Sequence, residues 1–492
     1  MKLSNRAWAY SHALLLLIFV SYGSTVFAES DKSINSKIEE TTDWREDYAY
    51  MLGVQAFIYG YPAIKNAAAR HDWVEAHMGS VRAKGNEYTH YQRLVGPEYQ
   101  FGTSMNRDTL YSLAWSYVGD GPLVFSIPKN PDNRYYSIEF TEWYTDAFAY
   151  MGSRTTGNEV ANYLVHAPGW NGDVPPGIDR VLESPTPWFL SVGRTYTTNT
   201  EEDLEIVHEI QRGFKIYALD EWGKGNPQQA EPIIDVLDAF PKDDPLGSFK
   251  LMNASMKENP PPARDLALMR LFALVGLGSE SDKDLNSLDE PTKRGLVRAL
   301  RDAPKFLQKV STSVGSITDA NKVVNGWVYN PSNWGRMAES SDFLGRSATQ
   351  SWSGGIENFV EEAVKLRSFT DANGLSLNGS NQYQLVFEKD QIPVVNAFWS
   401  ITLYDNKFNL IENEANKYAI RDIDKDIYYE TDGSLKILLQ PERPTEANVN
   451  WIPTPKDEGF NLFFRAYLPT EPFLNQSYVP PSIMLVNGVN SK

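Results

Sequence analysis

One pattern of short strands occurs twice in this chain, at positions far apart in the sequence. The run LVF at 123–125 precedes YSIEF at 136–140, and LVF at 385–387 precedes WSITL at 399–403. The Phe-to-Ser interval is 12 residues in the first copy and 13 in the second. Because aromatic antiparallel strands bury their faces only when sheet packs on sheet, the repeat predicts two related β-sandwich or jelly-roll-like domains.

The similarity continues beyond these strands. PTP at 185–187 leads into a strand ending RTY at 194–196, and PTP at 453–455 leads into one ending RAY at 465–467. Order and approximate spacing are kept, which favours an internal duplication. The alternative is that the two regions are similar only because β-sheet proteins share a similar amino-acid composition.

Apolar residues at helical spacing occupy much of the remaining sequence. They predict helices over 43–59, 63–77, 200–222, 263–277, 291–310 and 356–366. The predicted fold class is therefore mainly β with substantial helix (α+β), with two related sandwich domains joined by a helical region. The predicted segments are a signal peptide (1–28), a flexible leader (29–42), N-terminal helices with a polar-motif loop (43–118), a first β-sandwich domain (119–200), a helical linker region (201–368) and a second β-sandwich domain (369–492).

The first 28 residues resemble an export signal. Lys2 and Arg6 precede the apolar run 13–20, and Val26-Phe27-Ala28 provides a cleavage site. An apolar run this short favours a signal peptide over a membrane anchor. Cleavage removes two cations and no acid, so the net charge changes from −17 to −19. We expect a periplasmic or secreted acidic protein that has no membrane span after cleavage and does not bind nucleic acid.

The sequence lacks the common catalytic and cofactor motifs. It contains no Cys, no HExxH, no P-loop, no GxSxG and no GxGxxG, and its six His show no metal-ligand spacing. We therefore expect neither a cofactor nor a metal site. His90, in a polar loop, is the one histidine retained as a candidate. The sequence is compatible with a homo-oligomer.

Several distinctive segments resemble a known two-domain family. Residues 56–62, 106–112, 135–157 and 190–196 look like the family called domain of unknown function 1254. Residues 397–405, 432–440 and 450–455 look like its usual C-terminal partner, domain of unknown function 1214. The resemblance implies no settled activity. Arg107 departs from the Asn that is usual at the second position of the family's Asn-x-Asp-Thr-Leu-Tyr motif.

A dense group of polar residues precedes and follows the first aromatic strands. Asp108 and Glu142, with Glu139 and Asp146 nearby, are the candidates for acid and base roles, since paired carboxylates beside aromatic rings suit glycoside chemistry. The structural alternative is that Asn-x-Asp-Thr forms a turn and that a buried Asp–Arg pair locks a loop. The candidate ligand-binding residues are Asn106, Arg107, Asp108, Tyr111, Tyr144 and Arg154.

Two functions remain open at this stage. The first is binding or processing of a small or hydroxyl-rich, saccharide-like ligand in a cleft near the first β domain. The second is a non-catalytic envelope interaction or assembly protein whose polar motifs are structural. No feature decides whether the chain is an enzyme.

Overall fold

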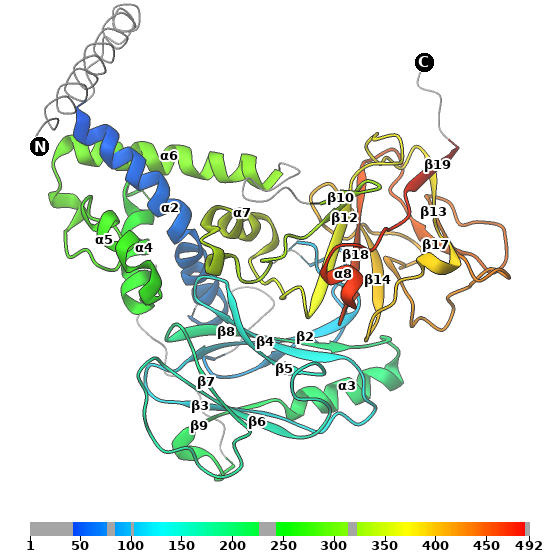
Figure 1. The fold of residues 1–492 in the computed structure, drawn as a ribbon, viewed down its shortest axis with the longest axis horizontal. Coiled ribbons are helices and arrows are strands. Elements are labelled where there is room, and N and C mark those ends of the chain that lie inside the picture. Colours follow the sequence, from blue (N-terminus) through cyan, green and yellow to red (C-terminus); the bar gives the residue numbers. More distant parts are fainter. Residues whose placement is uncertain (1–42, 76–83, 100–102, 226–242, 313–321, 488–492) are drawn as a thin grey trace, which may run out of the picture.

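A computed structural model describes residues 43–75, 84–99, 103–225, 243–312 and 322–487 (Figure 1). The predicted signal peptide and leader lie outside the described residues. Within that part of the chain, no helix has both the length and the apolar character that a membrane crossing requires.

The elements confirm the α+β class, with two β-rich regions and helices between them. The helices are α2 (Trp44–Arg70), its π-helical continuation η1 (His71–Glu75), α3 (Glu201–Gly213), η2 (Leu219–Glu221), α4 (Gly247–Glu258), η3 (Ala263–Asp265), α5 (Leu266–Ala273), η4 (Leu285–Ser287), α6 (Glu290–Thr312), η5 (Met337–Ser340), α7 (Phe343–Ser353), η6 (Lys389–Gln391) and α8 (Glu471–Leu474). The strands are β1 (Thr89–His90), β2 (Thr109–Tyr117), β3 (Leu123–Ile127), β4 (Tyr136–Glu142), β5 (Ala147–Gly152), β6 (Ala161–His166), β7 (Arg180–Glu183), β8 (Trp188–Tyr196), β9 (Lys215–Ala218), β10 (Val323–Val324), β11 (Trp327–Tyr329), β12 (Ala363–Ser368), β13 (Gln382–Phe387), β14 (Trp399–Asp405), β15 (Ala419–Arg421), β16 (Leu435–Gln440), β17 (Asn450–Pro453), β18 (Phe460–Tyr467) and β19 (Ile483–Asn487).

The first β-rich region, the first unit, is built from two sheets. One has the strand order β1-β2-β8-β4-β5 and the other the order β7-β6-β3-β9. Phe125, Phe140 and Phe189 come from both sheets and pack edge to face or tilted in the core between them. Each sheet thus buries one face against the other, as in a sandwich.

The second β-rich region, the second unit, repeats this topology. Its sheets have the orders β10-β11-β12-β18-β14-β15 and β17-β16-β13-β19. The strands β12 to β19 therefore occupy the places of β2 to β9 in turn, including the parallel pairs β6–β7 and β16–β17. The prediction of one repeated strand order is confirmed.

The strand registers align the two copies residue by residue. Ser137 pairs with Arg194 in the first unit, and Ser400 pairs with Arg465 in the second. These are the Ser and Arg positions of the sequence repeat, although the intervals between them differ.

Both units begin earlier in the chain than the sequence predicts. Strand β2 precedes residue 119, and β12 precedes residue 369. The helix predicted over 356–366 is wrong, because Val364, Leu366 and Ser368 alternate inward on a strand hydrogen-bonded between β11 and β18. Pairing with neighbouring strands outweighs a local helical pattern. The helix predicted over 200–222 ends at Gly213, and β9 begins at Lys215.

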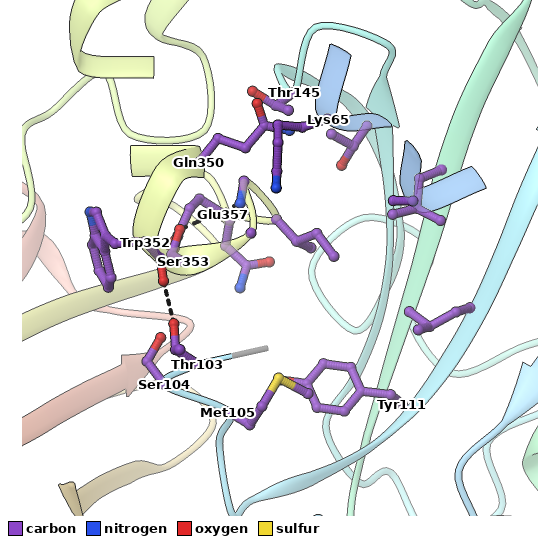
Figure 2. Close-up of a pocket in the computed structure, with 18 of the residues that line it drawn as sticks. Lys65, Thr103, Ser104, Met105, Tyr111, Thr145, Gln350, Trp352, Ser353 and Glu357 are labelled. Carbon is purple, nitrogen blue, oxygen red and sulfur yellow. Dashed lines mark hydrogen bonds between the residues drawn. The ribbon is translucent and has the colours of Figure 1, made fainter. Parts of the chain in front are cut away.

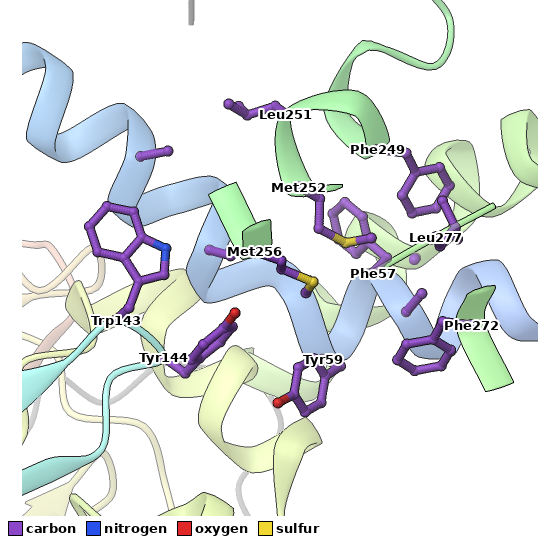
Figure 3. Packing of buried hydrophobic residues seen from close by; sticks show 14 of the residues in the cluster. Phe57, Tyr59, Trp143, Tyr144, Phe249, Leu251, Met252, Met256, Phe272 and Leu277 are labelled. Carbon is purple, nitrogen blue, oxygen red and sulfur yellow. The ribbon is translucent and has the colours of Figure 1, made fainter. Parts of the chain in front are cut away.

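The helices form a layer beside the first unit. In Figure 1, α2, α4, α5 and α6 gather at one end of the molecule and α7 lies between them and the second unit. Figure 3 shows Tyr59 of α2 and Met256 of α4 in one apolar core with Trp143 and Tyr144, which come from the first unit. The β4–β5 turn therefore inserts its aromatic rings into the helical layer.

The two helices predicted around Pro62 are a single helix, α2, so the predicted break at residues 60–62 is wrong. Proline cannot donate a hydrogen bond to the carbonyl four residues earlier. That carbonyl, of Ile58, instead accepts a hydrogen bond from the Ser347 hydroxyl of α7, and Arg346 donates to the next one, of Tyr59. Donors from α7 satisfy the carbonyls at this point and the helix continues.

Candidate functional site

A cavity of about 440 Å³ lies where the two units and the helical layer meet. Figure 2 shows Lys65 of α2, Tyr111 of β2 and the α7 residues Gln350, Trp352 and Ser353 around it. Its volume is in the range of small-molecule sites, and its wall draws on segments far apart in the sequence.

Aromatic side chains make up much of the wall, and Leu113, Leu190 and Ile356 add apolar surface. The aromatic lining residues are Trp73, Tyr99, Tyr111, Trp115, Trp334, Trp352 and Tyr467. Rings of this kind offer a large apolar contact area to a ligand.

Equivalent strands of the two units supply the central polar residues. Tyr111 lies opposite Arg194 on β2 and β8, and Lys365 lies opposite Arg465 on β12 and β18. All four line the cavity. The duplication therefore places two equivalent pairs in one wall.

Arg194 is paired with a buried carboxylate. Its Nη1 lies 2.6 Å from Glu139 Oε2 and 3.0 Å from Asn358 Oδ1. Thr141 donates to the other oxygen of Glu139. Glu139 and Arg194 are both almost fully buried. Their opposite charges give the pair no net charge, and the ion pair joins β4 to β8.

Arg465 has a different environment. Its Nη2 donates to Ser104 O at 2.7 Å and to Tyr404 OH at 2.9 Å, and its Nη1 lies 3.3 Å from Thr402 Oγ1. Among the described residues no carboxylate oxygen lies within 4 Å of this guanidinium. The groups in direct contact with Arg465 are therefore neutral. Although burial alone would lower it, Tyr404, Tyr467 and the more distant Asp108 carboxylate raise the pKa of Arg465.

Lys365 and Glu357 form a further ion pair in the wall, with 3.0 Å between Nζ and Oε2. Burial, together with the charge of Arg465, lowers the pKa of Lys365 to about 8. The Glu357 carboxylate acts in the opposite direction and raises this pKa. Although burial alone would raise it, the pKa of Glu357 lies below its usual range because of the Lys365 charge. Trp334 Nε1 also donates to Glu357.

Glu142 is the predicted acid–base candidate that lines the cavity. Its carboxylate accepts hydrogen bonds from the backbone N–H groups of Tyr144 and Asp146. Burial, followed by the charge of Asp146, raises the pKa of Glu142 to about 7. A carboxyl group in this range can exchange a proton near neutral pH.

Two of the six predicted ligand-binding residues line the cavity, Asn106 and Tyr111. Asn106 Oδ1 accepts from the N–H groups of Asp108 and Thr109, and its Nδ2 donates to Tyr111 OH at 2.7 Å. Asn106 thus forms the turn expected of Asn-x-Asp-Thr and also positions the Tyr111 hydroxyl.

Asp108 and Arg154 lie outside the wall and connect the two units. Asp108 Oδ2 accepts from Ser400 Oγ at 2.8 Å and from Tyr467 OH at 3.0 Å, both in the second unit. Arg154 Nε lies 2.7 Å from Glu362 Oε2. By register, Glu362 is the equivalent of Asp108, so the acid just before β2 and the acid just before β12 each reach into the other unit.

The other predicted residues have structural contacts outside the wall. Tyr144 is fully buried in the helical layer, where its hydroxyl donates to Asn259 O at 2.7 Å. Arg107 donates to Val95 O and stacks on the Tyr418 ring. His90 lies in β1, which pairs with β2, and burial lowers the pKa of His90 to about 4.

Sequence reasoning missed the charged residues at the centre of the wall, Arg194, Lys365 and Arg465. The repeated RTY and RAY endings contain the two arginines, so the repeat itself was an available signal. The sequence around Lys365 contained no such signal, because the apolar pattern of its segment resembled that of a helix. Within the described ranges, no group of His, Asp and Glu is arranged to hold a metal ion.

Two family models match the chain. The first, protein of unknown function (DUF1254), matches residues 85–218, and the second, protein of unknown function (DUF1214), matches residues 362–471. The chain therefore combines a DUF1254 domain with a DUF1214 domain. These ranges cover the strands of the first unit and all those of the second from β12 to β18.

One solved structure shows the same fold. The VPA0106 protein from Vibrio parahaemolyticus superposes with a TM-score of 0.67 at 20% identity, over 89% of this chain and 100% of that one. An uncharacterized protein from Burkholderia cenocepacia matches with a TM-score of 0.43 at 12% identity, over 88% of each chain. The comparison with curated proteins finds no match.

The DUF1254 and DUF1214 domains contribute to the cavity together. Tyr111 and Arg194 come from the DUF1254 domain, and Lys365 and Arg465 from the DUF1214 domain. The helical layer contributes Lys65. Neither domain forms this wall alone.

Proposed function

We propose that this is an exported protein that binds a small molecule in the cavity between its DUF1254 and DUF1214 domains. The amino-terminal pattern of a basic region, an apolar run and Ala28 supports export. Localisation in the periplasm or the medium follows from that pattern.

The observation that carries the proposal is the convergence on one cavity. Both copies of the repeat direct an arginine into the same wall, and aromatic rings surround them. Large apolar pockets with a few convergent polar groups are the usual form of a ligand site. The bonds of Asp108 and Arg154 between the units fix the relative position of the two halves of the wall.

The experiment is a thermal-shift screen of the mature protein with a cavity-filling variant. Ala69 lines the cavity on α2, whereas Gln55 is exposed on the same helix. A ligand at 100 times its Kd stabilises the native state by about 2.7 kcal/mol. We expect Ala69→Trp to abolish the shift caused by any cavity ligand and Gln55→Trp to preserve it.

Two results would contradict the proposal. One is a ligand whose shift is the same for wild type and for a folded Ala69→Trp variant. The other is a broad screen of sugars, lipids and small acids that stabilises neither protein. Either would favour the alternative of an interaction or assembly protein.

A further inference from the structure

We propose that the ligand carries an oxyanion, a carboxylate or a phosphate, on a flat apolar body, and that Arg465 binds the oxyanion. The inference rests on the proposed function, because it assigns the chemistry of a ligand in the same cavity. It adds a binding residue and a substrate class to that site.

The duplication provides an internal comparison for Arg465. In the first unit, the residue two positions after Ser137 is Glu139, which neutralises Arg194. In the second unit, the residue two positions after Ser400 is Thr402, which contacts Arg465 through a hydroxyl. The same arginine position thus has a carboxylate in direct contact in one copy and only neutral groups in direct contact in the other.

A buried guanidinium that has no carboxylate in direct contact is costly, and a folded protein rarely keeps one without a reason. The charge of Asp108 acts on Arg465 from a distance, but its Oδ2 is bound by Ser400 and Tyr467 and neither of its oxygens forms an ion pair with the guanidinium. A ligand anion is the partner that the cavity can supply.

Arg465 retains donors for such an anion. Its hydrogen bonds to Ser104, Tyr404 and Thr402 use both Nη2 hydrogens and one Nη1 hydrogen, so one Nη1 hydrogen and the Nε hydrogen remain. Ser104 and Tyr404 fix the guanidinium plane, which orders the remaining donors before a ligand arrives. A planar fork with ordered donors matches the geometry of a carboxylate or phosphate.

Neighbouring groups add donors to the wall. Tyr111 OH accepts from Asn106, which leaves its own hydrogen to donate. Lys365 lies opposite Arg465 in the strand register and forms an ion pair with Glu357. Lys65 of α2 and Asp72 of η1 also line the cavity, one as a cation and one as a carboxylate.

The body of the ligand is inferred from the remaining wall. Trp115, Trp334 and Trp352, with Leu113 and Leu190, present rings and aliphatic groups to the cavity. Flat apolar groups pack well against such rings. An aromatic acid is the simplest molecule that satisfies both parts of the site.

The test is isothermal titration of the mature protein with benzoate, phenyl phosphate and neutral benzamide. Wild type should bind at least one of the two anions about tenfold or more tightly than benzamide, since charge-assisted bonds contribute this much. Whichever anion binds more tightly distinguishes a carboxylate ligand from a phosphate ligand.

Variants then test the role of Arg465. Thr402→Glu copies the arrangement of Glu139 into the second unit and should weaken anion binding about tenfold while leaving benzamide unchanged. Arg465→Lys keeps the charge and should retain only part of the affinity for the anions. This variant tests the role of Arg465 even if Thr402→Glu does not fold. Arg301→Gln removes an exposed arginine of α6 that does not line the cavity and serves as the matched control, with no change expected.

The outcomes separate this inference from the proposed function. If neither anion binds more tightly than benzamide, or if Thr402→Glu and Arg465→Lys both bind the anions as wild type does, the oxyanion inference is wrong. Cavity binding would still stand if Ala69→Trp abolished the binding of a neutral ligand. If Ala69→Trp changes nothing for any ligand, both are wrong.

Discussion

Asp108 offers the sharpest test of how the two units are held together. It is completely buried and follows the turn formed by Asn106. Its Oδ2 accepts two hydrogen bonds, from Ser400 Oγ at 2.8 Å and from Tyr467 OH at 3.0 Å. Both donors belong to the second unit, so these bonds cross the junction that shapes the cavity.

Asp108→Ala removes a charged acceptor and leaves two buried hydroxyls without it. Each hydrogen bond to a charged group contributes about 1.5 to 3 kcal/mol. Removal also relieves the burial of a carboxylate whose Oδ1 has no hydrogen-bond partner. The net loss in the free energy of unfolding should be about 3 kcal/mol.

The assay is urea unfolding of wild type, Asp108→Ala, Ser400→Ala and the double variant, followed by tryptophan fluorescence. The double-mutant cycle isolates the bond between the units, and we expect a coupling energy of about 1.5 kcal/mol. Asp120→Ala, at an exposed position, should change stability by less than about 0.5 kcal/mol. A loss below about 1 kcal/mol for Asp108→Ala, or no coupling with Ser400→Ala, would refute the reasoning.

Three further predictions follow from the charges and the amino terminus. Folding raises the pKa of Glu142 from 4.5 to about 7, so between these pH values the folded state holds a proton that the unfolded chain has lost. The free energy of unfolding should therefore fall by about 3 kcal/mol as the pH rises through this window. Glu142→Gln should flatten that slope in unfolding curves measured from pH 4.5 to 7.5. Arg194→Met leaves the buried Glu139 carboxylate unpaired and should cost about 3 to 5 kcal/mol in the same assay, while a double change of Glu139→Gln with Arg194→Met should recover part of it; equal stability of wild type and single variant would contradict a structural ion pair. Mass spectrometry of the exported protein should find an amino terminus near Glu29, and an intact Met1 peptide would contradict signal cleavage.

The repeated topology could be predicted because it is encoded locally. Strands such as YSIEF and WSITL are aromatic and β-branched along their length, so the backbone state of each segment is already favoured before any tertiary contact. The helix expected over 356–366 shows the opposite case. Leu366 fits a helical face and a strand face equally well, and only pairing with β11 and β18 decides between them.

The cavity could be predicted only in part. Asn106 and Tyr111 were found because one dense motif contains them, whereas Arg465 and Lys365 are brought together by strand pairing across about a hundred residues. The function of a polar residue depends on what lies across from it, and the sequence does not state this. The structure places Asp108 and Tyr144 outside the wall, and the sequence does not show this because a polar or aromatic residue near a motif can face either a cavity or a neighbouring part of the fold.

The most direct measurement of the central claim is a crystal structure of the mature protein with the tightest ligand from the screen. We expect the ligand in the cavity, in contact with Tyr111 of the DUF1254 domain and within hydrogen-bond distance of Arg465 of the DUF1214 domain. A ligand bound outside this wall, with the cavity between the two domains unoccupied in the same crystal, would contradict the account.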